Sequence, residues 1–261
     1  MDVLILILTY IIVFFLGASI GSFSLVVVRR SQNKENGSWV TGKSVCESCK
    51  KELHWWEMIP TISFLMLRGK CSKCKAKIDP SHFFCETSVG VAYAIVFYLF
   101  ASGRIDIVQL LLMFFAHAVL IALSFSDILY RTINVIPLYV VGLTGAIYNA
   151  VKTGKYYYIA IIVGLFLISG FLCRKDCFSS FGAGDIDVCI CLLAITMSGF
   201  AWFDIIFYSA LVGIVLSLTV LRKSERNIPF VPCLYFGYIL CSCGLSLSKA
   251  IYDLMNQLMS L

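Results

Sequence analysis

The sequence predicts an all-α polytopic membrane protein with about eight transmembrane helices and a small cytoplasmic zinc-binding insert between helices 1 and 2. Three observations support this fold class. Hydrophobic residues make up 60% of the chain and charged residues only 14%, against about 25% charged residues in a soluble domain. Apolar runs of about 20 residues, the length that crosses a bilayer, recur along the chain. None shows the two-residue alternation of a barrel strand, which leaves helices as the expected spans.

The first apolar run is expected to be an uncleaved anchor with its amino terminus outside. It has no basic residue before it, it is longer than a signal peptide, and Arg29 and Arg30 follow it. A polar segment comes next and divides the chain into a first transmembrane helix (1–29), a cytoplasmic four-cysteine insert (30–82) and a multi-helix membrane domain (83–261). The expected spans lie near residues 3–28, 83–101, 105–126, 133–151, 156–173, 184–201, 203–221 and 230–250.

Basic residues predict the orientation of these spans. If residues 30–82 are cytoplasmic, 17 of the 21 Lys and Arg residues lie inside, as the positive-inside rule requires. The net charge of +6 therefore indicates topology and contact with anionic lipid heads, and not nucleic-acid binding. The basic residues expected outside are Arg104, Lys152, Lys155 and Lys249.

The polar insert contains two CxxC pairs, Cys46 with Cys49 and Cys71 with Cys74. Two thiolates at this spacing can hold one metal ion, and two such pairs complete a tetrahedral shell. In a reducing cytoplasm disulfides are a less favoured use of these cysteines. We therefore expect a closed, structural zinc site that gives the short insert a stable fold.

Two carboxylates are expected at one membrane depth. Ionisable residues in membrane segments are candidates for function, and the predicted topology brings Asp127 and Asp185 to the cytoplasmic face from different helices. Asp187 lies two residues from Asp185, which is about 200° around a helix, so the two should point in different directions. His117 is about 15 Å along its helix from Asp127 and is expected to be a hydrogen-bonded residue of the bundle.

A close pair of carboxylates can share one proton, so that one activates water while the other polarises a substrate carbonyl. This is the chemistry of aspartyl proteases. Gly182 and Gly184 leave room for an extended substrate backbone beside Asp185. The simpler alternative is that Asp127 and Asp185 only cap helix ends at the interface.

These features together resemble the type IV prepilin peptidases, which are bacterial membrane aspartyl proteases with a GxGD motif. The likeness runs through most of the chain: GSFSLVVVRR (21–30), the two CxxC pairs and the segment between them, Glu86 at the start of the second membrane helix, SDILYRTINVIP (126–137) and GAGD (182–185).

The resemblance implies a catalytic dyad of Asp127 and Asp185, zinc at the four cysteines, and substrate contacts that would involve Glu86, Gly182 and Gly184. Such enzymes lie in the bacterial cytoplasmic membrane and remove the basic leader from prepilins or pseudopilins of type IV pili, secretion or competence systems at the cytoplasmic face. Many then methylate the new amino terminus with S-adenosylmethionine.

The chain departs from the family pattern at two positions. Asp187 replaces a common lysine, and Leu25 replaces a common asparagine in the amino-terminal motif. Two other functions would require different sequence features. A presenilin-like GxGD protease would carry Tyr-Asp in its first motif, where this chain has Ser126-Asp127. A proton-coupled transporter would place acidic residues nearer mid-membrane and show an inverted repeat.

Overall fold

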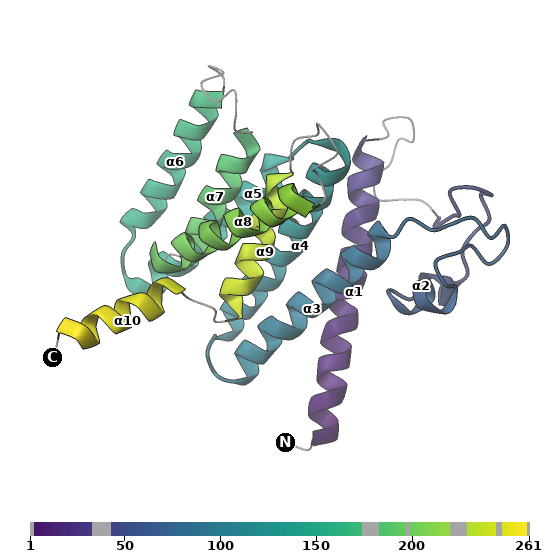
Figure 1. The fold of residues 1–261 in the computed structure, drawn as a ribbon, viewed down its shortest axis with the longest axis horizontal. Helices are drawn as coiled ribbons and strands as arrows, with labels where there is room; N and C mark the ends of the chain where they lie inside the picture. The colour runs from purple at the N-terminus through teal and green to yellow at the C-terminus, as the bar shows by residue number, and fades with distance from the viewer. Residues whose placement is uncertain are drawn as a thin grey trace. The chain divides into compact units, whose positions relative to one another are not determined.

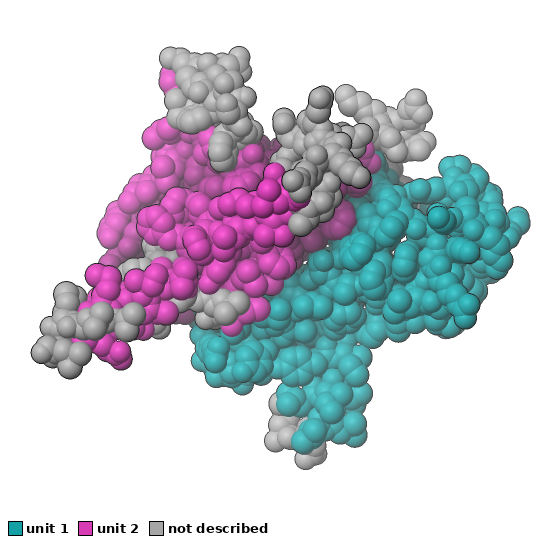
Figure 2. All heavy atoms as spheres, in the orientation of Figure 1, with its two compact units in different colours: residues 1–110 teal, residues 111–261 magenta. Residues whose placement is uncertain are grey.

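The computed structural model describes residues 3–32, 43–173, 183–196, 199–219, 229–243 and 247–259. Within these ranges the chain is helical apart from turns, short loops and two isolated β-bridges. It divides into two compact units, residues 1–110 and residues 111–261 (Figure 2). Each unit is described by itself.

The predicted all-α membrane fold is confirmed. The described residues contain five helices long and apolar enough to cross a membrane: Val3–Ser31, Ser81–Ala101, Ile107–Tyr130, Val135–Thr153 and Ala201–Leu218. Two further helical segments, Tyr157–Phe171 and Phe230–Ser242, are apolar but shorter than these five.

The last predicted span, residues 230–250, is wrong as a single helix. The structure has two helices there, α9 (Phe230–Ser242) and α10 (Leu247–Met259). Cys243 is the residue at which α9 ends, and the next described residue, Leu247, opens α10. The span predicted at 184–201 is also shorter than expected, because α7 covers Ala183–Thr196.

Unit 1 is built on the packing of α1 (Val3–Gln32) along α3 (Ser81–Ala101), which lie side by side in Figure 1. Glycines bring the two backbones together. A Cβ atom at Gly17 would lie 2.8 Å from the Val89 carbonyl oxygen, and one at Gly21 would lie 2.9 Å from the Cys85 carbonyl oxygen. Small residues at such positions allow membrane helices to approach closely.

The polar insert of unit 1 is tied to the end of α1. It contains a short 3₁₀ turn, η2 (Trp55–Met58), and one short helix, α2 (Ile62–Met66). The Arg29 guanidinium donates to Glu47 at 2.6 Å and also pairs with Asp79. Glu47 lies within the first CxxC pair and Asp79 lies near the end of the insert. The Arg29 side chain therefore links both parts of the insert to α1.

Unit 2 contains a group of three helices, α5 (Val135–Thr153), α6 (Tyr157–Cys173) and α7 (Ala183–Thr196). α5 and α7 run parallel. Near their starts the Tyr139 hydroxyl donates to Asp187 at 3.2 Å, and near their ends the Asn149 amide donates to the Ala194 carbonyl oxygen at 3.1 Å. The residues that open α5 and α7 therefore lie at the same end of unit 2.

The rest of unit 2 is organised around α9. It packs against α8 (Gly199–Thr219) so closely that a Cβ at Gly237 would lie 2.5 Å from the Ile205 carbonyl oxygen. It also contacts α4 (Ile107–Tyr130), where the buried His117 Nδ1 lies 3.3 Å from the Tyr235 hydroxyl. The expectation that His117 is a hydrogen-bonded residue of the bundle is thus confirmed.

Candidate active site and metal centre

The first acidic motif forms a closed turn at the end of α4. The Ser126 hydroxyl donates to the Thr132 carbonyl oxygen at 2.6 Å. The Arg131 N–H donates to the Asp127 carbonyl oxygen at 3.1 Å, and Arg131 itself has a left-handed backbone with φ of 56°. A non-glycine residue in this conformation costs about 1 kcal/mol or more, so the surrounding bonds must hold the turn in place.

Asp127 is buried, with 8% of its surface exposed. Its Oδ2 accepts the N–H of Val231, in the first turn of α9, at 3.3 Å. A carboxylate at a helix amino terminus interacts favourably with the helix dipole. Asp127 therefore has a structural bond of the kind that the helix-capping alternative predicts, and this bond also fixes the position of its carboxylate.

The second acidic motif packs against the first. A Cβ at Gly184 would lie 2.6 Å from Cδ1 and 3.0 Å from Cβ of Ile133, which belongs to the turn after Asp127. The two motifs therefore meet at one end of unit 2. This contact gives a reason for glycine at 184 that sequence reasoning missed; a substrate-binding role for Gly184 stays a prediction. Gly182 lies outside the described residues.

Asp185 and Asp187 have different surroundings although both lie in the first turns of α7. Asp185 is half-buried, whereas Asp187 is only 4% exposed. Asp187 contacts hydroxyl groups on two neighbouring helices, Tyr139 on α5 and Ser169 on α6. The residue that departs from the family pattern thus has polar partners of its own inside unit 2.

The four predicted metal ligands come together in unit 1. The Sγ atoms of Cys46, Cys49, Cys71 and Cys74 all lie within 4.8 Å of one another, and those of Cys46 and Cys74 are 3.9 Å apart. A tetrahedral Zn–S₄ site with bonds of about 2.3 Å requires sulfur separations of about 3.8 Å. The residues present therefore fit a zinc ion.

The two CxxC turns have matching backbone bonds. In the first, the Cys46 N–H donates to the Lys51 carbonyl oxygen; in the second, the Cys71 N–H donates to the Ala76 carbonyl oxygen, both at 2.9 Å. Each pair of cysteines is followed by a lysine with positive φ, Lys50 and Lys75. This repeated local geometry turns both cysteines of each pair toward one point.

The cluster favours thiolate at one of its cysteines. Backbone N–H groups of Cys74 and Lys73 lower the pKa of Cys71 to about 6. At Cys74 the N–H of Ala76 lowers the pKa of the thiol. Burial and the neighbouring sulfurs outweigh this effect and raise that pKa to about 11. A bound cation would also favour the thiolate form of Cys74, because metal coordination deprotonates thiols.

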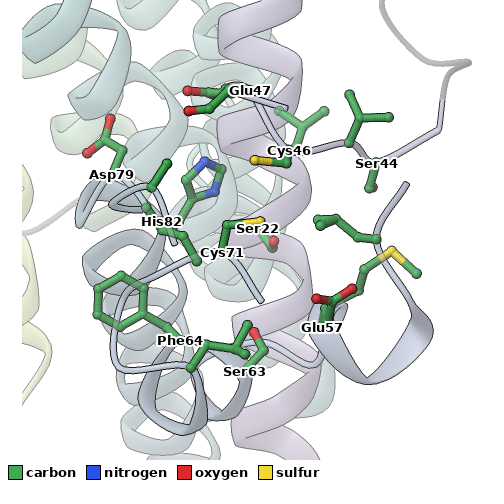
Figure 3. Close-up of a pocket in the computed structure, with 18 of the residues that line it drawn as sticks. Ser22, Ser44, Cys46, Glu47, Glu57, Ser63, Phe64, Cys71, Asp79 and His82 are labelled. Atoms are coloured by element: carbon green, nitrogen blue, oxygen red, sulfur yellow. The ribbon is translucent and has the colours of Figure 1, made fainter. Parts of the chain in front are cut away.

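A cavity of about 460 Å³ lies within unit 1, between the end of α1, the insert and the start of α3 (Figure 3). Glu86 contributes to its wall and is buried. Its Oε2 accepts the Thr61 N–H at 2.6 Å, and its carboxylate also bonds the Ser22 hydroxyl. Glu86 therefore connects α3 with the insert and with α1; its predicted contact with substrate stays a prediction.

Glu57 is a buried charge of the insert that sequence reasoning did not single out. It pairs with Lys51 at 2.9 Å and accepts bonds from the Ser72 hydroxyl and the His54 N–H. Burial alone would raise the pKa of Glu57, but these bonds lower it to about 2. No spacing in the sequence indicates this network, because Lys51 and His54 follow the first CxxC pair whereas Ser72 lies inside the second.

We expect Glu57→Gln to destabilise the insert by roughly 2 kcal/mol at pH 7. A carboxyl whose pKa is depressed by folding stabilises the fold above its unfolded pKa. The difference between wild type and variant should therefore shrink as the pH falls from about 4.5 and vanish near 2. Hydrogen exchange of the insert amides, corrected for intrinsic rates, measures it.

Glu52→Gln is the matched control, because Glu52 pairs with Lys43 on the surface and such pairs contribute at most about 1 kcal/mol. All three proteins carry the same four cysteines, so any metal that they bind would be released alike as the pH falls. Equal protection of wild type and Glu57→Gln at pH 7 would contradict the prediction.

Comparison with known proteins identifies relatives of the chain. The model of the bacterial peptidase A24 N-terminal domain matches residues 15–100. A prepilin leader peptidase/N-methyltransferase of Vibrio cholerae is 30% identical over 137 residues, 50% of this chain and 54% of the relative. One of Neisseria gonorrhoeae is 26% identical over 215 residues, 80% and 73% of the two chains.

A third relative of the same name, from Legionella pneumophila, is 24% identical over 78% of this chain and 70% of its own. The chain spans about half the length of the V. cholerae relative, and more of the other two. No solved structure gives a significant match. The chain is therefore similar to prepilin leader peptidase/N-methyltransferases over most of its length, and its residues 15–100 match the bacterial peptidase A24 N-terminal domain.

Proposed function

We propose that this chain is a membrane aspartyl endopeptidase that removes the leader peptide of type IV prepilins or pseudopilins. The observation that carries the proposal is the packing of Gly184 against Ile133, since it supports a site in which Asp127 and Asp185 act together. The relatives named above carry this activity in their names. No observation favours a presenilin-like protease or a transporter.

In the proposed reaction one aspartate acts as general base and the other as general acid. The ionised carboxylate takes a proton from a water molecule, whose oxygen attacks the scissile carbonyl carbon. The protonated carboxyl donates its proton to the carbonyl oxygen, which gives a neutral tetrahedral intermediate. When the C–N bond breaks, the leaving amine takes a proton from the first aspartate, and one hydroxyl of the intermediate returns a proton to the second as the new carboxyl group forms. No covalent bond to the protein forms.

The proposal is tested with the purified chain in lipid vesicles and a prepilin that carries its leader. We expect a single cut, which is measured by the mass of both products. A substrate whose leader junction is altered serves as the control. An intact prepilin after prolonged incubation with folded, zinc-loaded protein would refute the proposed activity.

We expect Gly184→Ala to slow cleavage about tenfold or more, because the new methyl group would press on Ile133 and displace Asp185. The double variant Ile133→Ala/Gly184→Ala should recover much of the rate, since it removes the side chain that the methyl group meets. The measurement is the rate of prepilin cleavage by wild type, by Gly184→Ala and by the double variant. A double variant as slow as Gly184→Ala would instead indicate that the glycine contacts the substrate backbone.

We propose that the insert binds one structural zinc ion through Cys46, Cys49, Cys71 and Cys74. The sulfur separations support this assignment. The ion would link the two CxxC turns and so hold together a segment with few apolar residues. It would supply no chemistry to cleavage, because a shell of four cysteines leaves no open position for substrate or water.

We also propose that the chain methylates the new amino terminus, as its relatives' names indicate. S-adenosylmethionine would supply the methyl group. The cavity of unit 1 is a candidate site, since its volume of about 460 Å³ is that of a small-molecule pocket. The buried carboxylate of Glu86 would face the positive charge of such a ligand, and Arg30 and Lys43 would face its carboxylate.

The proposed location is the bacterial cytoplasmic membrane, with the amino terminus outside and Asp127 and Asp185 at the cytoplasmic face. The distribution of Lys and Arg supports this orientation. It would place the dyad and the zinc insert on the side where prepilins are made. The prepilin and membrane lipids are the proposed partners.

A further inference from the structure

The helix α10 (Leu247–Met259) differs from its neighbours α8 and α9 in the distribution of its polar side chains. Its 13 residues measure about 20 Å, short of the roughly 30 Å that a bilayer core requires. It also separates polar and apolar side chains on opposite faces, whereas the neighbouring α8 and α9 are mainly apolar and show no such separation. A strongly two-sided helix is typical of one that lies in a membrane surface.

The apolar face of α10 is exposed. Leu247, Ile251 and Met255 follow one another at intervals of four residues, which places them within about 80° of each other around the helix, and each is 43–54% exposed. Asp253, Asn256 and Gln257 occupy an arc on the opposite side and are also exposed. Both faces are therefore available, one to an apolar and one to an aqueous environment.

The start of α10 is anchored to α8 at one end of unit 2. Ser248 donates to the buried Asp204 carboxylate through both its N–H and its hydroxyl, each at 2.9 Å. The nearby Cys241, at the end of α9, donates to the Ala201 carbonyl oxygen at 3.7 Å. The start of α8, the end of α9 and the start of α10 thus meet at one level.

This level is the opposite end of unit 2 from Asp127. Since Val231 at the start of α9 bonds Asp127, and α9 is one unbroken helix, its end at Ser242 lies a helix length away. The level is also where the lipid-facing surface begins, because Phe203, next to Asp204, is 64% exposed on a helix long enough to cross the membrane.

We propose that α10 lies flat in the lipid interface, on the membrane face opposite the acidic motifs. Leu247, Ile251 and Met255 enter the acyl-chain boundary, and Asp253, Asn256 and Gln257 face water. The occupant of the apolar face is lipid, because that face begins where Ser248 bonds Asp204, next to Phe203, which is exposed on a helix long enough to cross the membrane. The polar face carries Asp253 and no cluster of basic residues, so the attraction is apolar and does not require anionic lipid.

The test uses the full chain in phosphatidylethanolamine–phosphatidylglycerol vesicles. A nitroxide is attached to p-acetylphenylalanine placed singly at Ile251, Met255, Asp253 or Asn256, which leaves the native cysteines untouched. Leu211, an exposed residue within α8, is the reference for a lipid-facing position in a spanning helix. Accessibility to oxygen, which concentrates in lipid, is compared with accessibility to a water-soluble nickel complex.

We expect labels at 251 and 255 to show a several-fold higher oxygen-to-nickel ratio than labels at 253 and 256, and a lower ratio than the label at 211. The pattern should persist in vesicles of phosphatidylcholine alone. Four equally high ratios would mean that α10 is inserted, and four low ratios that it is detached from the membrane. Labels at 251 and 255 shielded from both reagents would mean that protein covers this face. Each of these three results would overturn the proposal.

Discussion

Asp127→Asn and Asp185→Asn are each expected to reduce leader cleavage by at least about 100-fold while leaving the protein folded, since positioned acid–base groups contribute rate factors of about 10²–10⁴. An amide can neither take the proton of the attacking water nor donate one to the carbonyl oxygen as a carboxyl does. The measurement is the rate of prepilin cleavage by purified variants whose detergent-extracted yield and thermal stability match those of wild type.

The double variant should be no slower than the slower single variant, because two residues that act as one unit have non-additive effects. Asp187→Asn is the matched control. It makes the same chemical change two residues away from Asp185, at a side chain that contacts Tyr139 and Ser169. We expect it to keep cleavage within a few-fold of wild type. Full activity of either Asp127→Asn or Asp185→Asn would refute the proposed dyad.

The quadruple Cys→Ser variant at positions 46, 49, 71 and 74 is expected to lose all bound zinc and the fold of the insert. Apparent zinc-binding free energies in small four-ligand sites are about 10–16 kcal/mol at neutral pH, which is more than such a segment gains from packing. Wild type should contain one zinc ion per chain by elemental mass spectrometry. Limited proteolysis should then cut the variant within residues 43–79 and spare wild type.

Cys241→Ser/Cys243→Ser provides the control for this experiment. These cysteines belong to a CxC sequence at the end of α9, which lacks the spacing of the four ligands. We expect this double variant to keep its zinc and the protease resistance of its insert. Equal zinc content in the quadruple variant and wild type would reject the metal site.

Periodicity and spacing were sufficient to predict the features that depend on neighbouring residues in the chain. Long apolar runs require helices, because backbone groups cannot stay unbonded in lipid. The two CxxC pairs predicted the cluster of Cys46, Cys49, Cys71 and Cys74, since each pair turns its thiols to one side within four residues. These predictions hold without knowledge of which helix lies beside which.

The contacts of the acidic motifs could not be predicted in this way. The topology suggested that Asp127 and Asp185 lie at one depth, but the contact of Gly184 with Ile133 depends on the parallel packing of α5 and α7. Likewise the bond from Val231 to Asp127 requires α9 to start beside the end of α4. Each joins residues from separate helices, and hydropathy contains no information on which faces meet.

The sequence by itself predicted the membrane helices, the cluster of four cysteines and the two acidic motifs that resemble those of prepilin peptidases. Only the tertiary structure decided where the last apolar run breaks, what surrounds Asp187, and which network buries Glu57. The physical reason is the separation along the chain of the residues that interact. Helix formation and metal-ligand spacing are governed by residues a few positions apart, whereas burial and pairing of a polar side chain depend on partners that folding brings from distant parts of the chain.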